Sequence, residues 1–336
     1  MLFSSFEFLY LFLPLTLLVY FSVPWRGKNY VLLGASIIFY GIASPRALPL
    51  LLAVAFADWG AGWLVSRAVR SEREKRANAV VAASVAFNVA VLVFFKYFDP
   101  LISAFGGEPI GIELPSGISF YIFQAMSYVF DVRRREVEAQ KNGVVFLTYV
   151  SLFPQLVAGP IVRYSDVEGE LDRRKHTLTG VADGIVLFCV GLAKKVLLAN
   201  GAGQVWERMA VLSDRGGTVL GAWLGIVAFA FQIYFDFSGY SDMARGLGKV
   251  FGFNFPENFR YPYISCSITE FWRRWHITLS AWFREYVYIP LGGNRRGRGR
   301  TYLNLLTVWS LTGIWHGAGL NFLIWGLYFF LILVPV

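Results

Sequence analysis

Apolar residues gather into long runs along this chain, separated by short polar segments. Nine of the runs, among them 48–65, 79–95 and 219–237, are of spanning or near-spanning length, since a helix needs roughly 20 apolar residues to cross a bilayer. No hydrophilic segment between the runs is long enough to form a second domain. We therefore predict a single all-α, polytopic membrane domain over residues 1–336, to which the other apolar runs also contribute: 6–23, 30–42, 118–130, 144–157, 181–198 and 303–336.

Two of these segments are short for a membrane helix. Residues 120–130 and 144–160 are bounded by Pro or Gly and fall below the length of a straight span. Either could be a re-entrant segment, which enters the bilayer and leaves it on the same side.

The composition supports the membrane assignment. Hydrophobic residues make up 56% of the chain and charged residues only 16%, whereas about 25% of a soluble domain is charged. The formal charge of +9 suggests a nucleic-acid partner at first sight, but the basic residues fall mostly in the gaps between apolar runs. Orientation in a membrane explains that placement better, so we predict no nucleic-acid partner.

The basic residues also predict an orientation. If the run 48–65 passes from outside to inside, most of the 31 Lys and Arg residues face the cytoplasm, as the positive-inside rule requires. The N-terminus is then extracytoplasmic. Lys194 and Lys195 lie near a span end, where long side chains can snorkel. The basic residues left outside are Arg46, Lys96, Arg208 and Arg215.

Polar side chains occur within or beside the predicted spans. Asp58 lies inside one span. A larger group of polar residues lies in FDFSGYSDMARG, at the end of the run 219–237. A carboxylate at mid-helix costs about 2.5–3.5 kcal/mol on insertion scales, so it normally faces the bundle interior or a water-filled cavity. A hydrogen bond or ion pair between helices is one interpretation for both places. The lining of a cavity is the other for the larger group, which consists of Asp236, Ser238, Tyr240, Ser241 and Asp242.

Several catalytic signatures are missing from the sequence. GLGKV lacks the upstream glycine of a P-loop, and no G-x-S-x-G elbow surrounds a serine. The fifth residue after each histidine is Val181, Ala281 or Asn321, which excludes the HxxxxD arrangement of soluble-type glycerolipid acyltransferases. The two cysteines have no CxxC or His-rich context, so they indicate neither a metal site nor a disulfide framework.

Of the three histidines, His276 lies in a predicted amphipathic helix. Ser267 and Glu270 form a capping box, which predicts a helix over 268–289 that ends at Pro290. Its charged residues exclude a simple span, so we expect it at the cytoplasmic interface or in the mouth of the bundle. An interfacial histidine that bonds a backbone carbonyl is the alternative to a functional one. The helix carries two apolar stripes, one of Phe271, Trp275, Thr278, Trp282 and Tyr286 and one of Trp272, His276, Leu279 and Phe283.

The second histidine, His316, lies near the middle of the uncharged run 303–336. An ionisable group inside a membrane is a functional-site hypothesis by default. A neutral imidazole is suited to take a proton from a hydroxyl, which is worth about 10²–10⁴ in rate. A packing histidine bonded to a helix carbonyl is the alternative. The flanking residues that would let a helix or substrate approach closely, or orient the ring, are Gly313, Gly317, Gly319, Asn304 and Asn321.

Six sequence blocks occur in order along most of the chain: LFSSFEFLYLFLP, LPSGISFYIFQAMSYVFDV, FPQLVAGPIVR, YFDFSGYSDMARGLG, ENFRYPYISCSITEFWRRWHITLSAWFREYVYIPLGGN and IWHGAGLNFLIWG. In these blocks the chain resembles the membrane-bound O-acyltransferase family. The similarity is strongest to its bacterial branch, which includes alginate O-acetyltransferase membrane subunits and teichoic-acid D-alanyl transfer proteins. SITEFWRRWHI and YFDFSGYSDMA are most similar to the alginate type.

The resemblance implies a fold and an activity. The fold would be a ring of about nine or more spanning and re-entrant helices around a tunnel through a thinned membrane. The activity would move an acetyl group from a cytoplasmic thioester such as acetyl-CoA towards hydroxyls of an alginate-like exopolysaccharide outside the bacterial inner membrane. Membrane lipids and a periplasmic acetyltransferase would be partners, and neither a bound cofactor nor a metal is implied.

The resemblance also assigns residues to the site. The family's invariant catalytic histidine matches His316, and its second polar position matches His276. Arg273, Arg274 and the basic segment 295–300 could attract a phosphorylated donor at the cytoplasmic entrance, where the basic segment could also anchor lipid headgroups. The candidate substrate-binding residues are Trp315, Trp272, Asp236, Tyr240, Asn321, Arg273 and Arg274.

Two other functions stay open at this point. One is a D-alanyl or lipid acyltransferase of the same family, and the other is a transporter or channel subunit whose polar clusters line a path. Matching half-repeats, which secondary transporters show, are missing from the sequence. Family members continue through further helices, whereas this chain ends 20 residues after His316 with the apolar segment 331–336, so we expect a C-terminally truncated domain.

Overall fold

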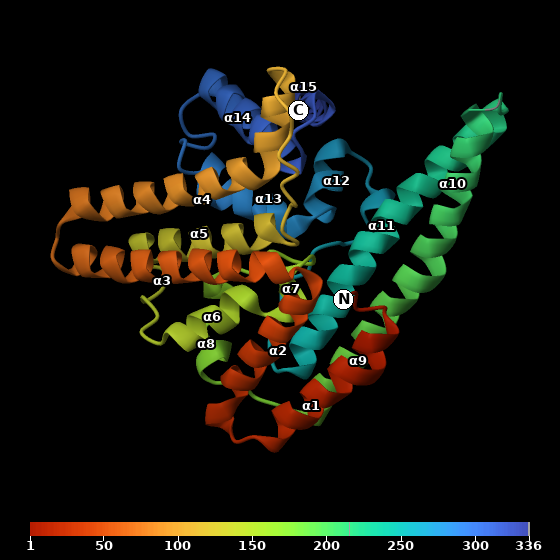
Figure 1. Cartoon of the computed structure of the whole chain (residues 1–336). Coiled ribbons are helices and arrows are strands. Elements are labelled where there is room, and N and C mark those ends of the chain that lie inside the picture. Colours follow the sequence, from red (N-terminus) through yellow and green to blue (C-terminus); the bar gives the residue numbers. More distant parts are fainter. Residues whose placement is uncertain (215, 335–336) are drawn as a thin grey trace. The chain divides into compact units, whose positions relative to one another are not determined.

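The computed structural model describes residues 1–214 and 216–334 (Figure 1). Arg215 of the orientation argument, and Val336 at the end of the run 303–336, therefore lie outside the described residues. Over the described ranges the chain forms helices and no strands, which confirms the all-α prediction. It divides into two compact units that alternate along the sequence, the first made of Met1–Ala43, Ser151–Pro160 and Asp166–Asn258 and the second of Ser44–Val150, Ile161–Ser165 and Phe259–Val336.

Long apolar helices identify the chain as a multi-pass membrane protein. Within the described residues, three helical segments are long and apolar enough to cross a membrane: Pro45–Arg70, Glu74–Ala104 and Val219–Val250. They contain the predicted runs 48–65, 79–95 and 219–237 and extend beyond them. The ring of helices around a tunnel stays a prediction, as does the single domain.

The first unit contains the helices that precede residue 44 and those between 151 and 258. Its largest part is a group of helices in which α9 and α10 both pack along α11 (Figure 1). Its elements are the π-helix η1 (Phe8–Phe12), α1 (Leu13–Ser22), η2 (Trp25–Gly27), α2 (Lys28–Ala43), α7 (Phe153–Leu156), most of α8 (Tyr164–Asp172), α9 (Leu178–Ala193), the π-helix η4 (Lys194–Ala199), α10 (Asn200–Asp214) and α11 (Val219–Val250).

Pairs of glycines bring α9 and α11 into backbone contact. A Cβ on Gly191 would lie 2.5 Å from the carbonyl oxygen of Gly239, and one on Gly184 would lie 2.7 Å from that of Gly246. Small residues allow such close packing, which drives helix association in lipid where the hydrophobic effect does not. The two glycine pairs therefore fix how these helices cross.

This close packing places two lysines beside the polar group of α11. Lys194 Nζ lies 2.6 Å from Asp242 Oδ2, and Lys195 forms an ion pair with Asp236. The ion-pair interpretation therefore applies to both carboxylates. The neighbouring polar residues also have contacts within the unit, since Tyr240 stacks on Phe3 with 4.5 Å between ring centroids and Ser241 accepts a hydrogen bond of 3.0 Å from Asn258.

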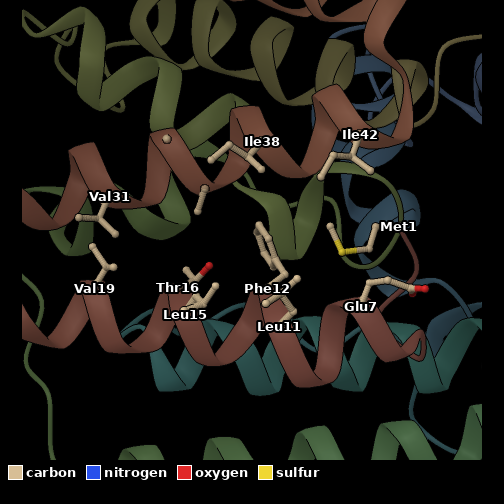
Figure 2. Close-up of a pocket in the computed structure, with 12 residues that line it drawn as sticks. Met1, Glu7, Leu11, Phe12, Leu15, Thr16, Val19, Val31, Ile38 and Ile42 are labelled. Carbon is tan, nitrogen blue, oxygen red and sulfur yellow. The ribbon is translucent and has the colours of Figure 1, made fainter.

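An apolar groove of about 730 Å³ lies between the η1–α1 segment and α2 in the first unit (Figure 2). Leu15 and Val19 on α1 face Val31 and Ile38 on α2 across it, and Glu7 lies at one end. Aliphatic walls of this kind are compatible with lipid tails, which are as apolar as leucine.

The second unit holds both C-terminal histidines. Its helices α3, α4 and α5 pack side by side, and α15 packs on α14 (Figure 1). Its elements are η3 (Pro45–Ala47), α3 (Leu48–Arg70), α4 (Glu74–Ala104), α5 (Ile118–Arg134), nearly all of α6 (Gly143–Ser151), η5 (Pro262–Ile264), α12 (Ile268–Arg274), α13 (Ile277–Phe283), the π-helix η6 (Arg284–Tyr288), α14 (Arg298–His316) and α15 (Leu320–Leu333).

Asp58 joins two of these helices. Its fully buried carboxylate on α3 accepts hydrogen bonds from Ser84 Oγ at 2.5 Å and from Asn88 Nδ2 at 2.8 Å, both on α4. Hydrogen bonds from buried polar neighbours offset the cost of removing the carboxylate from water. The structural interpretation of Asp58 is therefore confirmed.

Three predicted continuous segments are broken in the structure. The run 144–157 is interrupted at Leu152, between α6 and α7, where Pro154 follows in the first turn of α7. The predicted helix 268–289 is interrupted at Trp275 and His276, and the run 303–336 at 317–319. The last two breaks build the candidate site.

Candidate active site

The predicted helix 268–289 begins as expected but does not continue past Arg274. Ser267 Oγ accepts a hydrogen bond of 3.1 Å from the Glu270 N–H, and the Glu270 carboxylate accepts one of 2.9 Å from the Cys266 N–H. The capping box thus forms, with the glutamate reaching one residue further back than its usual partner. Its helix, α12, is only seven residues long.

His276 lies at the break that follows. Its backbone is left-handed, with φ +44° and ψ 54°, and its carbonyl accepts the first hydrogen bonds of α13 from Leu279 and Ser280. A non-glycine residue in this conformation costs about 1–3 kcal/mol and persists where the surroundings enforce it, often at active sites. The prediction of one continuous helix was wrong here, because neither Gly nor Pro marks the position of the break.

Both predicted apolar stripes have distinct partners despite the break. The stripe of Trp282 and Tyr286 packs on α5: Trp282 stacks on Phe123 with ring centroids 3.9 Å apart, and Tyr286 donates a hydrogen bond of 2.7 Å to Asp131. The other stripe lines a single cavity with all four of its members, Trp272, His276, Leu279 and Phe283. The first stripe therefore anchors the segment and the second faces the site.

His316 is the last residue of α14, so it does not lie in the middle of a continuous helix as predicted. The segment 317–319 is extended, and α15 folds back along α14. A Cβ on Gly326 would lie 2.4 Å from the Trp309 carbonyl oxygen, and one on Gly313 would lie 2.5 Å from that of Phe322. The expected close approach at Gly313 is therefore made by α15. The His316 side chain is exposed at this turn.

Trp315 contacts both imidazoles. Its ring centroid is 4.8 Å from that of His316 and 6.3 Å from that of His276, and Trp325 contacts His316 from α15 at 4.9 Å. His276 is outside the three long apolar helices and is only 3% exposed. Burial and, to a lesser extent, repulsion from a protonated His316 together lower the pKa of His276 to about 3. His276 is therefore neutral at physiological pH, with one ring nitrogen as donor and the other as acceptor.

Both histidines line one cavity of about 620 Å³. Its walls come from α12, α13, the π-helix η6, α14 and the end of α15, and η6 contributes Arg284 and Tyr288. The exposed guanidiniums of Arg273 and Arg284 lie on this wall with the imidazoles. The arrangement combines a proton acceptor, a neutral imidazole and two positive charges. It is suited to proton transfer on a substrate that carries an anionic group.

Three of the candidate substrate-binding residues lie at this cavity. Trp272 and Arg273 line it, and Trp315 contacts both histidines from the adjoining wall. Arg274 is instead engaged by its own helix and the preceding loop, since it pairs with Glu270 at 2.8 Å and donates a hydrogen bond of 3.1 Å to the Arg260 carbonyl.

The other candidates lie elsewhere. Asn321 is exposed at the start of α15, where its side-chain oxygen packs over Gly319: a Cβ there would lie 2.2 Å from it. Asn304 donates a hydrogen bond of 2.8 Å to the Gly293 carbonyl and so holds the turn before α14. Asp236 and Tyr240 lie on α11 in the first unit, with the partners described above.

The structure adds residues that the sequence did not single out. Arg284, the first residue of η6, and Trp309, on α14, also line the cavity. Lys96 Nζ, on α4, donates to the Trp315 carbonyl, and Tyr97 Oη donates to the Ile314 carbonyl. A lysine directly after an apolar run is a signal that was available, but we used it only to predict orientation.

Comparison with known proteins connects this geometry to a family. The model of the membrane-bound O-acyltransferase family matches residues 89–335. The probable alginate O-acetylase AlgI of Azotobacter vinelandii is 45% identical, over 97% of this chain and 66% of that protein. The protein of the same name from Pseudomonas putida is 44% identical, over 97% and 68%, and the peptidoglycan O-acetyltransferase of Helicobacter pylori is 34% identical, over 97% and 68%.

The chain spans about two thirds of the length of these relatives. The family match covers α12, α13 and α14 of the second unit, which line the cavity, and most of the sequence blocks in which the resemblance was seen. The chain belongs to the membrane-bound O-acyltransferase family.

Proposed function

We propose that this chain is an O-acyltransferase that moves an acetyl group from a cytoplasmic thioester, acetyl-CoA or another acyl thioester, across the membrane towards hydroxyls of an extracytoplasmic polysaccharide. The observation that carries the proposal is the cavity shared by His276, His316, Arg273 and Arg284. The names of the relatives, an alginate O-acetylase and a peptidoglycan O-acetyltransferase, support acetyl as the transferred group and a glycan as the acceptor.

His316 is the general base in this reaction. Its imidazole takes the proton of the acceptor hydroxyl as the hydroxyl oxygen attacks the thioester carbonyl. An oxygen–carbon bond forms, the carbon–sulfur bond breaks, and the proton passes from the imidazolium to the departing thiolate, which leaves as a thiol. Base action of this kind contributes about 10²–10⁴ in rate.

His276 assists as the second imidazole on the cavity. Because it is neutral, its N–H can donate a hydrogen bond to the acyl carbonyl oxygen, where negative charge develops, or hold the acceptor hydroxyl in place. The left-handed backbone of His276 sets the direction of its ring, which lines the cavity. A continuous helix would give the ring another direction.

The guanidiniums serve the donor. Arg273 and Arg284 lie on the cavity wall, and positive charge there attracts the phosphates of a coenzyme A thioester. The exposed arginines of segment 295–300, which lie just before α14 and in its first turn, extend this positive region along the chain. Arg274 is left out of this role because Glu270 and the Arg260 carbonyl occupy it.

The setting of the reaction follows from the same proposal. The protein would lie in the inner membrane of a bacterium with its N-terminus outside, as the distribution of Lys and Arg favours. A separate periplasmic acetyltransferase would take the acyl group onward to the final polysaccharide.

An assay with radiolabelled acetyl-CoA tests the proposal. Membranes that contain the chain should consume the thioester and produce an O-acetyl ester on an added glycan, and His316→Ala should slow both by about 10²–10⁴. His176→Ala is the matched control, since His176 contacts Tyr20 within the first unit. Transport of a substrate without consumption of the thioester would favour a transporter, and full activity of His316→Ala would exclude the base role.

A further inference from the structure

The last turn of α14 is held by two consecutive residues of α4. Lys96 donates to the Trp315 carbonyl, and Tyr97 donates to the Ile314 carbonyl. The last four carbonyls of a helix have no partner within the helix, and their partial negative charge favours a cation. Lys96 and Tyr97 therefore cap α14 from a neighbouring helix, next to His316.

In the part of the chain that the structure describes, few groups balance the charge of Lys96. Among the residues that the structure describes, no carboxylate forms an ion pair with it, and its ammonium lies 5.4 Å from the centroid of the Trp315 ring. Removing an ammonium from water without compensation is expensive. The carbonyl, the helix terminus and the indole face supply that compensation, and all three belong to the turn that carries His316.

Packing alone does not fix this turn. A cavity of about 330 Å³ adjoins Lys96, Tyr97 and Trp315, and the His316 side chain is exposed. A helix end with an exposed side chain and a void beside it is prone to fray, because few buried contacts oppose opening. The two hydrogen bonds from α4 oppose it.

We propose that Lys96, supported by Tyr97, is a positioning residue: it fixes the last turn of α14 so that the His316 imidazole keeps its place at the cavity. The inference deepens the proposed function and rests on it for the consequence in catalysis. The fixed geometry of the turn is a separate claim that can be measured without any substrate.

Two measurements on the same variants test the inference. The first is kcat and the donor KM of acetyl transfer. The second is the rate at which diethyl pyrocarbonate modifies each histidine, measured by mass spectrometry. His276, which is buried, and His176, which lies in the first unit, are the internal references. The variants are Lys96→Met, Lys96→Arg and Tyr97→Phe. Arg46→Met is the control. It also replaces a basic residue by methionine, but Arg46 forms only an exposed ion pair with Glu113, at 3.4 Å, so the variant loses a surface charge and nothing else.

Lys96→Met should lower kcat by about 10- to 100-fold and leave the donor KM within about twofold, because misplacement of a catalytic group by about 1 Å costs up to 10² in rate. It should also speed the modification of His316 several-fold. Lys96→Arg keeps a charged donor and should restore most of kcat. Tyr97→Phe removes one hydroxyl. It should lower kcat by about two- to fivefold and speed the modification of His316 by a similar factor.

The outcomes separate the two levels of the argument. If the Lys96 and Tyr97 variants match Arg46→Met in kcat and in His316 modification, the positioning role is wrong. If Lys96→Met does not fold, Tyr97→Phe and Lys96→Arg decide by the same criteria. If modification of His316 changes as expected but His316→Ala is fully active, the turn is held as described and the proposed function fails.

Discussion

His276 and His316 line the same cavity, and different forces hold them there. His276 is buried, and its own backbone places it, through a left-handed residue between α12 and α13. His316 is exposed at the end of α14, and its place depends on residues of other helices: Lys96 on α4, and Phe322 and Trp325 on α15.

The difference separates two ways of building an active site. A strained residue fixes its side chain locally and at a cost in stability of about 1–3 kcal/mol. A helix end is unstrained, but it needs external partners for its carbonyls. Substitutions that change backbone preference, such as glycine for alanine, should therefore have their largest effect at position 276. Substitutions in neighbouring helices should instead affect the placement of His316.

The largest expected effect comes from replacing each imidazole by an amide. His316→Gln removes the base and should reduce acetyl transfer by about 10²–10⁴, whereas His276→Gln keeps an N–H donor and should reduce it by about tenfold. Initial rates on purified protein, at matched amounts of folded chain, measure both. Equal losses at the two positions would remove the functional distinction between them.

The second effect tests the dependence of His316 on α15. Gly326→Ala places a methyl group 2.4 Å from the Trp309 carbonyl oxygen, so α15 must shift, at about 1–3 kcal/mol. The variant should unfold at a lower temperature. Diethyl pyrocarbonate should modify its His316 faster, while His276 stays protected. Gly60→Ala on α3 is the control, because a Cβ there meets nothing within 4 Å. Similar behaviour of the two variants would contradict the tight α14–α15 contact.

The third effect separates neighbouring arginines on the His276 side. Arg273→Ala removes a charge from the cavity wall and should raise the donor KM by about tenfold, since a hydrogen bond to a charged group is worth about 1.5–3 kcal/mol. Arg274→Ala should change the donor KM less and lower thermal stability instead, because Arg274 pairs with Glu270. A rise in KM for Arg274→Ala alone would reverse these assignments.

The smallest effect compares glycine with alanine at the two positions. At 276 the left-handed backbone favours glycine, so His276→Gly should be more stable than His276→Ala by about 1 kcal/mol. At 316 the backbone is helical, so His316→Ala should be the more stable variant by up to about 1 kcal/mol. Thermal unfolding in one detergent orders the four proteins. The same order at both positions would show that His276 is not strained.

Much of the site could be predicted from residue type and spacing. The Ser267 cap set the start of α12, and the stripe of Trp272, His276, Leu279 and Phe283 was correctly grouped because helical spacing survives a short break. The glycines beside His316 correctly indicated a close helix contact at Gly313.

The breaks themselves could not be predicted in the same way. The bend at His276 has no glycine or proline to signal it, since tertiary packing enforces the left-handed residue. The capping of α14 by Lys96 joins residues 219 positions apart, which periodicity cannot relate. Gly317 and Gly319 within an apolar run did carry a signal for the turn, which we interpreted only as room for a neighbour.

Burial of His276 also determines how the protein should respond to acid. In an unfolded chain a histidine titrates near pH 6.5, whereas burial holds the pKa of His276 at about 3 in the folded chain. As the pH falls from about 6.5 to about 3, the unfolded chain therefore takes up a proton that the folded chain refuses, and this histidine's share of stability is progressively lost. The residue that anchors one wall of the cavity thus makes that wall a point of acid sensitivity.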